Sequence, residues 1–265
     1  MTDVVLCEVR DGVALVTLNR PDRLNAWTQE MEHVYFGLLE DCGEREDVRV
    51  IVVTGAGRGF CAGADMAELE AIGEGTLEAG EHERRPQTLP LGVPKPILAA
   101  INGPCAGIGL VQALMCDLRF AATDAKLTTA FARRGLVAEH GISWVLPRLV
   151  GPARALDLLL SARVVLGEEA AHLGLVNRAL PGEELLGFTM DYARDLAANC
   201  SPASMATMKR QVWGDLERGL AETLARADEL MLASFGAPDF AEGVQSFLAR
   251  RAPDFAPLSA QRSRA

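Results

Sequence analysis

The sequence predicts an α/β fold followed by a helical C-terminal segment. Two apolar runs with the character of buried strands each lead into a glycine-rich turn, and the second turn opens directly into an uncharged helix. From Ser201 onward the whole pattern is helical. Repeated strands, glycine turns and helices with a helical tail are typical of an α/β protein with an appended α subdomain. We therefore expect a core at 1–200 and a helical subdomain at 201–265.

The first part of the chain alternates strands with a helix. A valine-rich run predicts a strand at 12–18, and a β-branched run predicts a second strand, buried on both faces, at 48–55. Apolar residues recur at helical spacing over 28–45, where Thr28 is placed to cap the helix. Residues 66–95 lose periodicity, gain charge and end in proline-rich sequence. We expect that segment to be mobile and to form part of a pocket rim.

The middle of the chain continues the alternation. A strand at 96–101 ends in a glycine-rich turn, and a helix at 110–116 and a strand at 117–123 follow. Ser201 and Pro202 form a good N-cap and N1 pair for the first C-terminal helix. The other expected elements are helices at 151–161, 167–173 and 183–198 and a short strand at 175–180.

Composition narrows the classes of partner. The chain of 265 residues has a formal net charge of −10, which argues against nucleic acid. Its four histidines and six cysteines lack metal-binding spacing, so we expect no metal and free thiols in a reducing compartment. The N-terminus lacks the basic and apolar regions of a signal peptide, and no apolar run is long enough to cross a membrane. We expect a cytoplasmic protein.

The two glycine-rich turns, "VVTGAGRGFCAGADM" (52–66) and "INGPCAGIGLVQALMCD" (101–117), are candidate binding elements. The glycines of the first miss the GxGxxG spacing, and no acidic residue follows at the place of a ribose ligand, which disfavours a dinucleotide site. Backbone N–H groups at a turn or helix start can bind an anion or a polarised carbonyl. Two converging N–H donors would form an oxyanion hole.

Four motifs carry a family resemblance: "NRPDRLNAW" (19–27), "GRGFCAGADM" (57–66), "INGPCAGIGLVQALMCDLRFAA" (101–122) and "PRLVGPARALDLLLSAR" (147–163). They resemble the crotonase (enoyl-CoA hydratase/isomerase) superfamily, and the likeness extends to "FAEGVQSFLARRAPDF" (240–255). The resemblance implies a crotonase-type spiral of ββα units whose C-terminal helices build homotrimers, often paired into hexamers. It also implies an acyl-CoA or enoyl-CoA substrate, with coenzyme A as part of that substrate and no permanently bound cofactor.

The resemblance places the two oxyanion donors at the backbone N–H groups of Ala64 and Ile108. Ile108 stands where many members have glycine. A backbone donor needs no particular side chain, but isoleucine narrows the space beside the carbonyl. Asp65 would hold the turn that aims the Ala64 N–H. The positions expected to contact substrate on the two turns are Ala62, Asp65, Met66, Gly107 and Val111.

The residues for hydration depart from the family pattern. Hydratases that resemble this chain carry one glutamate at the position of Val111 and another at the position of Phe131. Addition of water needs groups that deprotonate water and protonate carbon. Neither Val111 nor Phe131 transfers a proton, so we do not expect an ordinary two-glutamate hydratase.

Glu139, eight residues after Phe131, is the acid that remains in this neighbourhood. Members similar to hydroxyisobutyryl-CoA hydrolase and chlorobenzoyl-CoA dehalogenase keep a catalytic carboxylate at the corresponding place. Apolar neighbours favour partial burial and a raised pKa for Glu139. The alternative is a solvent-facing acid or an ion-pair partner of Arg133 or Arg134. His140 would point elsewhere in an extended segment, and we expect it to be structural.

The other expected substrate contacts lie farther along the chain. Phe131 and Trp144 would line the acyl pocket or the core. Arg23 stands where the family often has a basic residue near the phosphates of coenzyme A. Phe247 and Arg250 belong to a C-terminal segment that resembles the one reaching coenzyme A, often from a neighbouring subunit.

Three functions are compatible with these residues. The first is isomerisation or atypical hydration of an enoyl-CoA, with Glu139 as acid and base. The second is hydrolysis of an acyl-CoA thioester by water that Glu139 activates. The third is a non-catalytic acyl-CoA-binding protein, which the missing glutamates favour and Glu139 disfavours.

Overall fold

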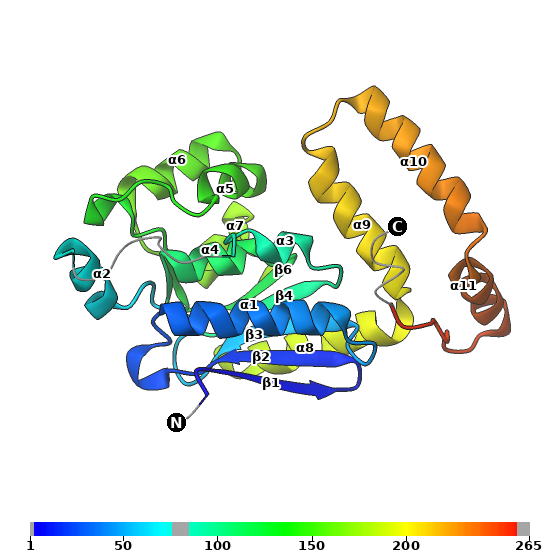
Figure 1. The fold of residues 1–265 in the computed structure, drawn as a ribbon, viewed down its shortest axis with the longest axis horizontal. Coiled ribbons are helices and arrows are strands. Elements are labelled where there is room, and N and C mark those ends of the chain that lie inside the picture. The colour runs from blue at the N-terminus through cyan, green and yellow to red at the C-terminus, as the bar shows by residue number, and fades with distance from the viewer. Residues whose placement is uncertain (1–2, 76–84, 259–265) are drawn as a thin grey trace.

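A six-stranded sheet forms the centre of the molecule in the computed structural model, which describes residues 3–75 and 85–258 (Figure 1). Its strand order is β1-β2-β3-β4-β6-β9, and a smaller sheet has the order β5-β7-β8. The large sheet comprises β1 (Val5–Arg10), β2 (Val13–Leu18), β3 (Val50–Gly55), β4 (Ile97–Ile101), β6 (Leu118–Ala122) and β9 (Arg178–Leu180). The small sheet comprises β5 (Cys105–Ala106), β7 (Lys126–Thr128) and β8 (Val165–Leu166).

The large sheet is parallel except at its first edge. β1 and β2 form an antiparallel hairpin whose turn residues, Asp11 and Gly12, both have positive φ (52° and 75°), as a tight hairpin turn requires. β2, β3, β4, β6 and β9 then pair in parallel. Every residue of β3 and β4 is buried, which matches their continuous apolar sequence. The strands predicted from sequence are confirmed, whereas β1, β5, β7 and β8 were not foreseen.

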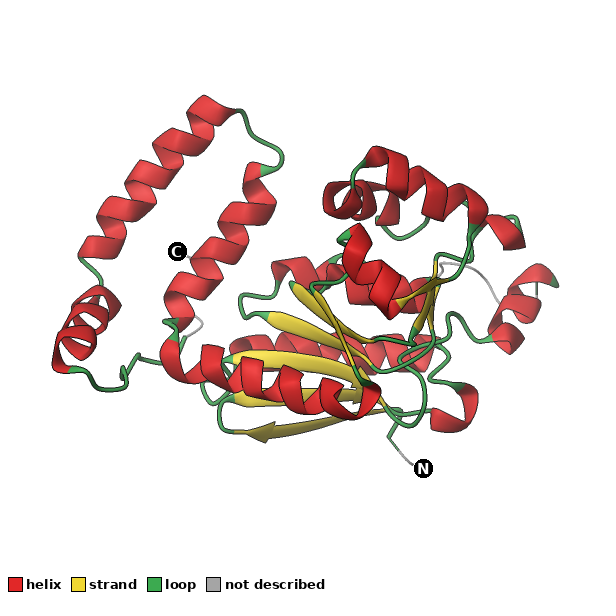
Figure 2. Cartoon of the chain, turned by 180° about the vertical axis from the view of Figure 1, so that it is seen from behind, coloured by secondary structure: helices red, strands yellow, loops and turns green. Residues whose placement is uncertain are grey.

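Helices cover both faces of this sheet. α1 (Gln29–Glu44) packs on β1 and β2, and α8 (Gly182–Asn199) packs on β2, β3, β4 and β6 from the opposite side, as Figure 2 shows. The other helices are α2 (Met66–Gly73), α3 (Leu89–Gly92), α4 (Ile108–Met115), α5 (Ile142–Val150), α6 (Pro152–Ser161), α7 (Gly167–Leu173), α9 (Pro202–Asp215), α10 (Leu220–Phe235) and α11 (Pro238–Ala249), with short 3-10 turns at Pro21–Arg23 and Ala132–Arg134.

The predicted helix starts at Thr28 and Ser201 are confirmed. The Thr28 hydroxyl accepts a hydrogen bond of 3.1 Å from the Met31 N–H, and the Ser201 hydroxyl accepts one of 3.1 Å from the Ser204 N–H. These bonds satisfy N–H groups that lack an intrahelical acceptor. Pro202 follows Ser201 in the first turn of α9, where its missing N–H costs nothing.

The segment 66–95, which lacks periodicity in sequence, contains two helices that were not predicted. Met66–Gly73 forms α2, because the Asp65 side chain accepts a hydrogen bond from the Ala67 N–H at 3.1 Å and caps the helix. Leu89–Gly92 forms the short helix α3, with Pro90 in its first turn. Residues 76–84 lie outside the described residues, so the expected mobility of that part stays a prediction.

The last three helices form an arm that projects from the sheet (Figure 1). The side chain of Lys209 anchors α9: it is 8% exposed, pairs with Asp117 at 2.8 Å and donates to the Pro90 carbonyl at 3.0 Å. No residue of α10 is buried in the single chain. The predicted boundary at residue 200 falls between α8 and α9, and the division into two domains stays a prediction. No helix within the described ranges has both the length and the apolar composition to span a membrane.

Candidate active site

The two glycine-rich turns lie against each other. The Ala106 N–H donates to the Cys61 carbonyl at 3.0 Å, so the two segments pair like short strands. Gly63 has φ of +105°, and a Cβ there would lie 3.3 Å from the Ala106 carbonyl oxygen; Gly107 has φ of +49°, and a Cβ there would lie 3.9 Å from the Gly63 Cα. Glycine at both positions therefore permits the backbone geometry and this close approach.

The residues that follow these glycines, Ala64 and Ile108, each present a backbone N–H at the junction. On either side of Ala64, the Gly63 carbonyl accepts from the Trp27 N–H at 2.8 Å and the Asp65 N–H donates to the Trp27 carbonyl at 2.9 Å. Ile108 is the first residue of α4, where an N–H has no intrahelical acceptor. Over residues 3–75 and 85–258, neither the Ala64 nor the Ile108 N–H donates to a protein oxygen. Such a pair of donors suits an oxygen that carries negative charge.

Asp65 holds the first of these turns. Its carboxylate caps α2 and also accepts a 2.9 Å hydrogen bond from the Arg20 guanidinium, which in turn donates to the Ala26 carbonyl at 2.5 Å. Burial raises the pKa of Asp65, but the hydrogen bonds from Arg20 and from the Ala67 N–H outweigh that effect, and the pKa lies below its ordinary value. The ionised Asp65 therefore ties the 19–27 motif to the turn that carries Ala64.

Glu139 lies two residues before Gly141, the N-cap of α5, and α5 packs against α4. Its carboxylate Oε2 is 3.4 Å from the Nε2 atom of His140, and the two side chains are 31% and 27% exposed. The expectation that His140 points elsewhere is wrong, because the segment is not extended: His140 has φ of +59° and turns back onto Glu139. Arg133 donates instead to the Ser161 carbonyl at 3.1 Å.

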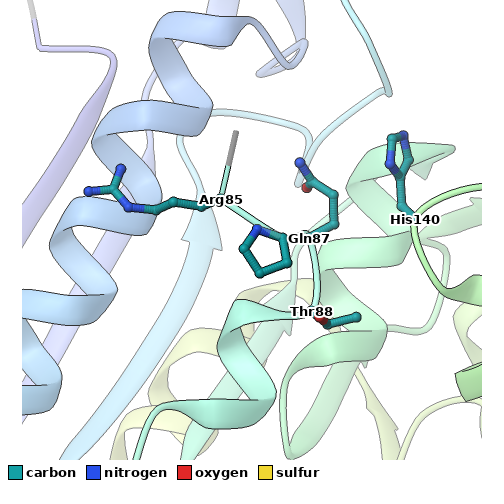
Figure 3. A pocket seen from close by; sticks show the side chains of 5 residues that line it. Arg85, Gln87, Thr88 and His140 are labelled. Atoms are coloured by element: carbon teal, nitrogen blue, oxygen red, sulfur yellow. The ribbon is translucent and has the colours of Figure 1, made fainter. Parts of the chain in front are cut away.

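An open pocket of about 350 Å³ adjoins the Glu139 turn. It is lined by Arg85, Pro86, Gln87, Thr88 and His140. Figure 3 shows His140 across the pocket from Arg85, with Gln87 between them. A Cβ at Gly141 would lie 3.2 Å from Thr88 Cγ2, so the turn packs closely against the pocket wall. Ala64 and Ile108 are not among the described residues that line this pocket.

A buried polar network connects the pocket wall to the turn of Ala64. The Glu32 carboxylate on α1 accepts from the Trp27 indole N–H at 3.1 Å and from the Gln87 amide at 2.7 Å. The Gln112 amide on α4 donates to Gln87 Oε1 at 2.7 Å. Glu32, Gln87 and Gln112 are 5%, 9% and 2% exposed. The sequence analysis missed these residues, although Glu32 and Gln112 are polar residues within the apolar faces of their helices.

Val111 and Phe131, the positions at which we expected an ordinary hydratase to carry glutamates, are apolar and buried. Val111 lies in α4 with no exposed surface, and its N–H donates to the Gly107 carbonyl at 3.0 Å. Phe131 is 5% exposed and belongs to the same hydrophobic core. Trp144, by contrast, faces the arm: the Arg148 guanidinium lies 4.0 Å above its ring, and the Trp213 ring of α9 lies 5.9 Å away.

The other predicted contact residues fall into two groups. Arg23 and Met66 are exposed beside the turn of Ala64, and the Ala62 N–H donates to the Leu24 carbonyl at 3.0 Å. Phe247, which is 83% exposed, and Arg250, which caps α11, lie on the arm away from these turns (Figure 1). Within one chain, Phe247 and Arg250 therefore do not approach the turn of Ala64.

The family is decided by comparison with known proteins. A family model described as enoyl-CoA hydratase/isomerase matches residues 8–257. The chain belongs to the enoyl-CoA hydratase/isomerase family. A probable enoyl-CoA hydratase of Rhodobacter capsulatus is 37% identical over 250 residues, which cover 94% of this chain and 96% of the relative. The 1,2-epoxyphenylacetyl-CoA isomerase of Escherichia coli is 34% identical, over 96% of this chain and 99% of its own.

Solved structures agree with the family. A probable enoyl-CoA hydratase/isomerase from Mycobacterium abscessus superposes with a TM-score of 0.89 and 33% identity, covering 96% of this chain and 99% of that one. The predicted crotonase-type α/β fold is confirmed, and so is an enzyme of the enoyl-CoA hydratase/isomerase type.

Proposed function

We propose that this member of the enoyl-CoA hydratase/isomerase family isomerises the acyl group of an enoyl-CoA, with the thioester oxygen between the Ala64 and Ile108 N–H groups and Glu139 as acid and base. The observation that carries the proposal is the backbone contact between Gly63 and Gly107, which brings onto adjoining turns two N–H groups that have no acceptor among the described residues. Coenzyme A enters as part of the substrate, and no resident cofactor is needed for this chemistry.

The chemistry divides between polarisation and proton transfer. The Glu139 carboxylate removes a proton from an acyl carbon, and the electron pair of that C–H bond moves toward the thioester oxygen. The two N–H groups stabilise the resulting negative charge, aided by the positive end of the α4 dipole. Protonated Glu139 then returns the proton to another carbon, which relocates the double bond. His140, 3.4 Å away, orients the carboxylate.

Two features favour isomerisation over ordinary hydration. Val111 and Phe131 are buried and have no proton to transfer, so the pair of carboxylates that suits water addition is missing. One relative, 34% identical over nearly its full length, is named as an isomerase of a coenzyme A thioester. The proposal also includes an atypical hydration of the enoyl-CoA in which Glu139 is the only acid and base.

Thioester hydrolysis is the second candidate. The Glu139 side chain is 31% exposed, so water reaches it in the free enzyme. A water molecule deprotonated by Glu139 would attack the polarised carbonyl carbon and expel the coenzyme A thiol. The non-catalytic binding protein is the third candidate, since it needs only the N–H pair.

The arm supplies the basis for proposing a homotrimer or homohexamer. Phe247 and Arg250 lie away from the glycine turns of their own chain, so they would reach coenzyme A only in the site of a second copy. The helix α10, which buries no residue in the single chain, would supply surface for that contact. Arg23 is exposed beside the Ala64 turn, and we propose that it binds the phosphates of coenzyme A. The acidic protein with free cysteines fits a cytoplasmic location.

A substrate panel tests these candidates. Wild type, Glu139→Gln and the control Glu183→Gln, an exposed acid on α8, are assayed with enoyl-CoA and acyl-CoA thioesters of different chain lengths. Loss of a general acid/base costs about 10²- to 10⁴-fold in kcat, so Glu139→Gln should lose activity. Both glutamine variants should still bind acyl-CoA as wild type does. Release of free thiol identifies hydrolysis. Equal turnover by wild type and Glu139→Gln would refute the role of Glu139, and tight binding without turnover throughout the panel would favour the binding protein.

A further inference from the structure

Two cysteines distant in sequence lie sulfur to sulfur outside the candidate site. Cys7 is on the edge strand β1 and Cys42 is in the last turn of α1, and their Sγ atoms are 3.8 Å apart. The side chains of β1 alternate, so that Val5, Cys7 and Val9 face the helix. Cys42 is fully buried, whereas Cys7 is only half-buried and is open to solvent reagents.

Charged groups surround this sulfur pair. The buried Lys95 ammonium donates to the Cys42 carbonyl at 2.7 Å and to the Arg45 carbonyl. Arg45 is one turn beyond Cys42 and pairs with Asp47 at 2.7 Å and Asp41 at 3.8 Å. Arg45 favours a thiolate at this pair, and Asp41 and Asp47 oppose it.

The two thiols differ in acidity. The hydrogen bond from Cys42 lowers the pKa of Cys7 to about 7, helped by Arg45 and opposed by burial, Asp41 and Asp47. The same hydrogen bond, together with burial, raises the pKa of Cys42 well above its ordinary value. Cys7 is therefore the nucleophile of the pair, and Cys42 is the thiol that stays protonated beside it.

We propose that Cys7 and Cys42 form a reversible dithiol–disulfide site that reacts with hydroperoxides. The Cys7 thiolate attacks one peroxide oxygen and breaks the O–O bond; the other oxygen leaves and takes up a proton. Cys7 is then a sulfenic acid. The Cys42 sulfur loses its proton, attacks the Cys7 sulfur and displaces its oxygen as water. Two thiols are oxidised to one disulfide, and hydrogen peroxide is reduced to two waters.

The other cysteines lack this combination of access and a neighbouring thiol. Cys61, Cys105 and Cys116 are fully buried, and burial raises the pKa of each. Cys200 is half-buried like Cys7, but burial and Asp195 raise its pKa. Within the described ranges, Cys7 and Cys42 are the pair of sulfurs in hydrogen-bonding contact. Cys200 is therefore the matched control.

The disulfide would tie the edge strand to α1. Closing a loop between residues 35 apart restricts the unfolded chain, and we expect a rise in melting temperature of about 5–10 °C that dithiothreitol reverses. The link leaves the turns of Ala64 and Ile108 untouched, since both of its ends lie outside them.

The test treats wild type, Cys7→Ser, Cys42→Ser and Cys200→Ser with hydrogen peroxide at pH 7 and maps peptides without reduction. Wild type and Cys200→Ser should yield the 7–42 disulfide, and Cys42→Ser should yield a sulfenic acid at Cys7 that dimedone traps. Alkylation of Cys7 by iodoacetamide should rise with pH around a midpoint of about 7. Circular dichroism establishes that each variant folds. Peroxide modification of Cys200 as fast as that of Cys7, or no 7–42 disulfide in folded wild type, would overturn the proposal.

Discussion

The indole N–H of Trp27 donates a 3.1 Å hydrogen bond to the buried carboxylate of Glu32. The backbone of Trp27 also brackets Ala64, through hydrogen bonds to Gly63 and Asp65. Trp27 therefore joins the turn of Ala64, the proposed oxyanion donor, to a carboxylate in α1, and that carboxylate accepts a hydrogen bond from Gln87 of the pocket wall. Hydrogen bonds among buried polar groups therefore fix the position of the turn that carries Ala64.

Glu32→Ala should destabilise the protein by about 2–4 kcal/mol, because the Trp27 N–H and the Gln87 amide would lose their buried acceptor. Glu32→Gln keeps an acceptor oxygen and should therefore lose less stability than Glu32→Ala. Denaturant unfolding of the two variants measures the difference. Equal stability of Glu32→Ala and wild type would show that the network contributes nothing.

Asp65→Asn should lower stability by about 1 kcal/mol at neutral pH and reduce kcat/KM, since asparagine can still cap α2 but loses the ion pair with Arg20. The folded-state pKa of Asp65 is lowered. Its contribution is therefore present above the unfolded pKa of about 4 and is lost as pH falls through the folded value. Melting temperatures of both proteins between pH 2 and 8 should converge at the acid end. A constant gap across that range would contradict this account.

Gly109→Ala should prevent stable folding. A Cβ at Gly109 would lie 2.4 Å from the Cys61 carbonyl oxygen and 2.6 Å from its Cβ, so α4 could not keep its contact with the first turn. Gly187→Ala on α8 is the control, because a Cβ there meets nothing within 4 Å. The control should be neutral or more stable by about 0.5–1 kcal/mol. Soluble yield and thermal unfolding distinguish them.

Lys209→Met should loosen the arm, because it leaves the mostly buried Asp117 carboxylate without its 2.8 Å ion pair. Loss of one partner of a buried pair costs about 3–5 kcal/mol. Limited proteolysis should cut the variant near α9 faster than wild type. The exposed control Arg226→Gln on α10 should behave as wild type, and similar cleavage of all three proteins would count against the anchor.

The strands and most helices follow from local pattern. β3 and β4 are continuous apolar runs, and α1 has an apolar stripe behind a capping threonine, so each can be predicted from its own residues. β1 was missed because the alternation of Val5, Cys7 and Val9 with polar residues is short and lies on an edge. α2 was missed because Asp65 acts as its cap only once the turn before it has formed.

The part of the candidate site that consists of backbone groups could be predicted from the sequence. The glycine turns mark where Ala64 and Ile108 lie, since the positive φ values of Gly63 and Gly107 favour glycine. The positions of His140 and Gln87 depend on tertiary structure. The left-handed conformation of His140 and the convergence of Glu32, Gln87 and Gln112 from three separate segments leave no local pattern in the sequence.

The contact between the turns of Gly63 and Gly107 has a consequence for how this fold can change its chemistry. The two proposed N–H donors belong to the main chain of the glycine turns, whereas Glu139, the proposed acid and base, is a side chain on another segment. Moving a carboxylate from one position in the sequence to another therefore leaves the backbone N–H groups of Ala64 and Ile108 in place. If Glu139 acts as proposed, the acid and base of this fold change independently of the backbone donors, and valine at 111, phenylalanine at 131 and glutamate at 139 are one such arrangement.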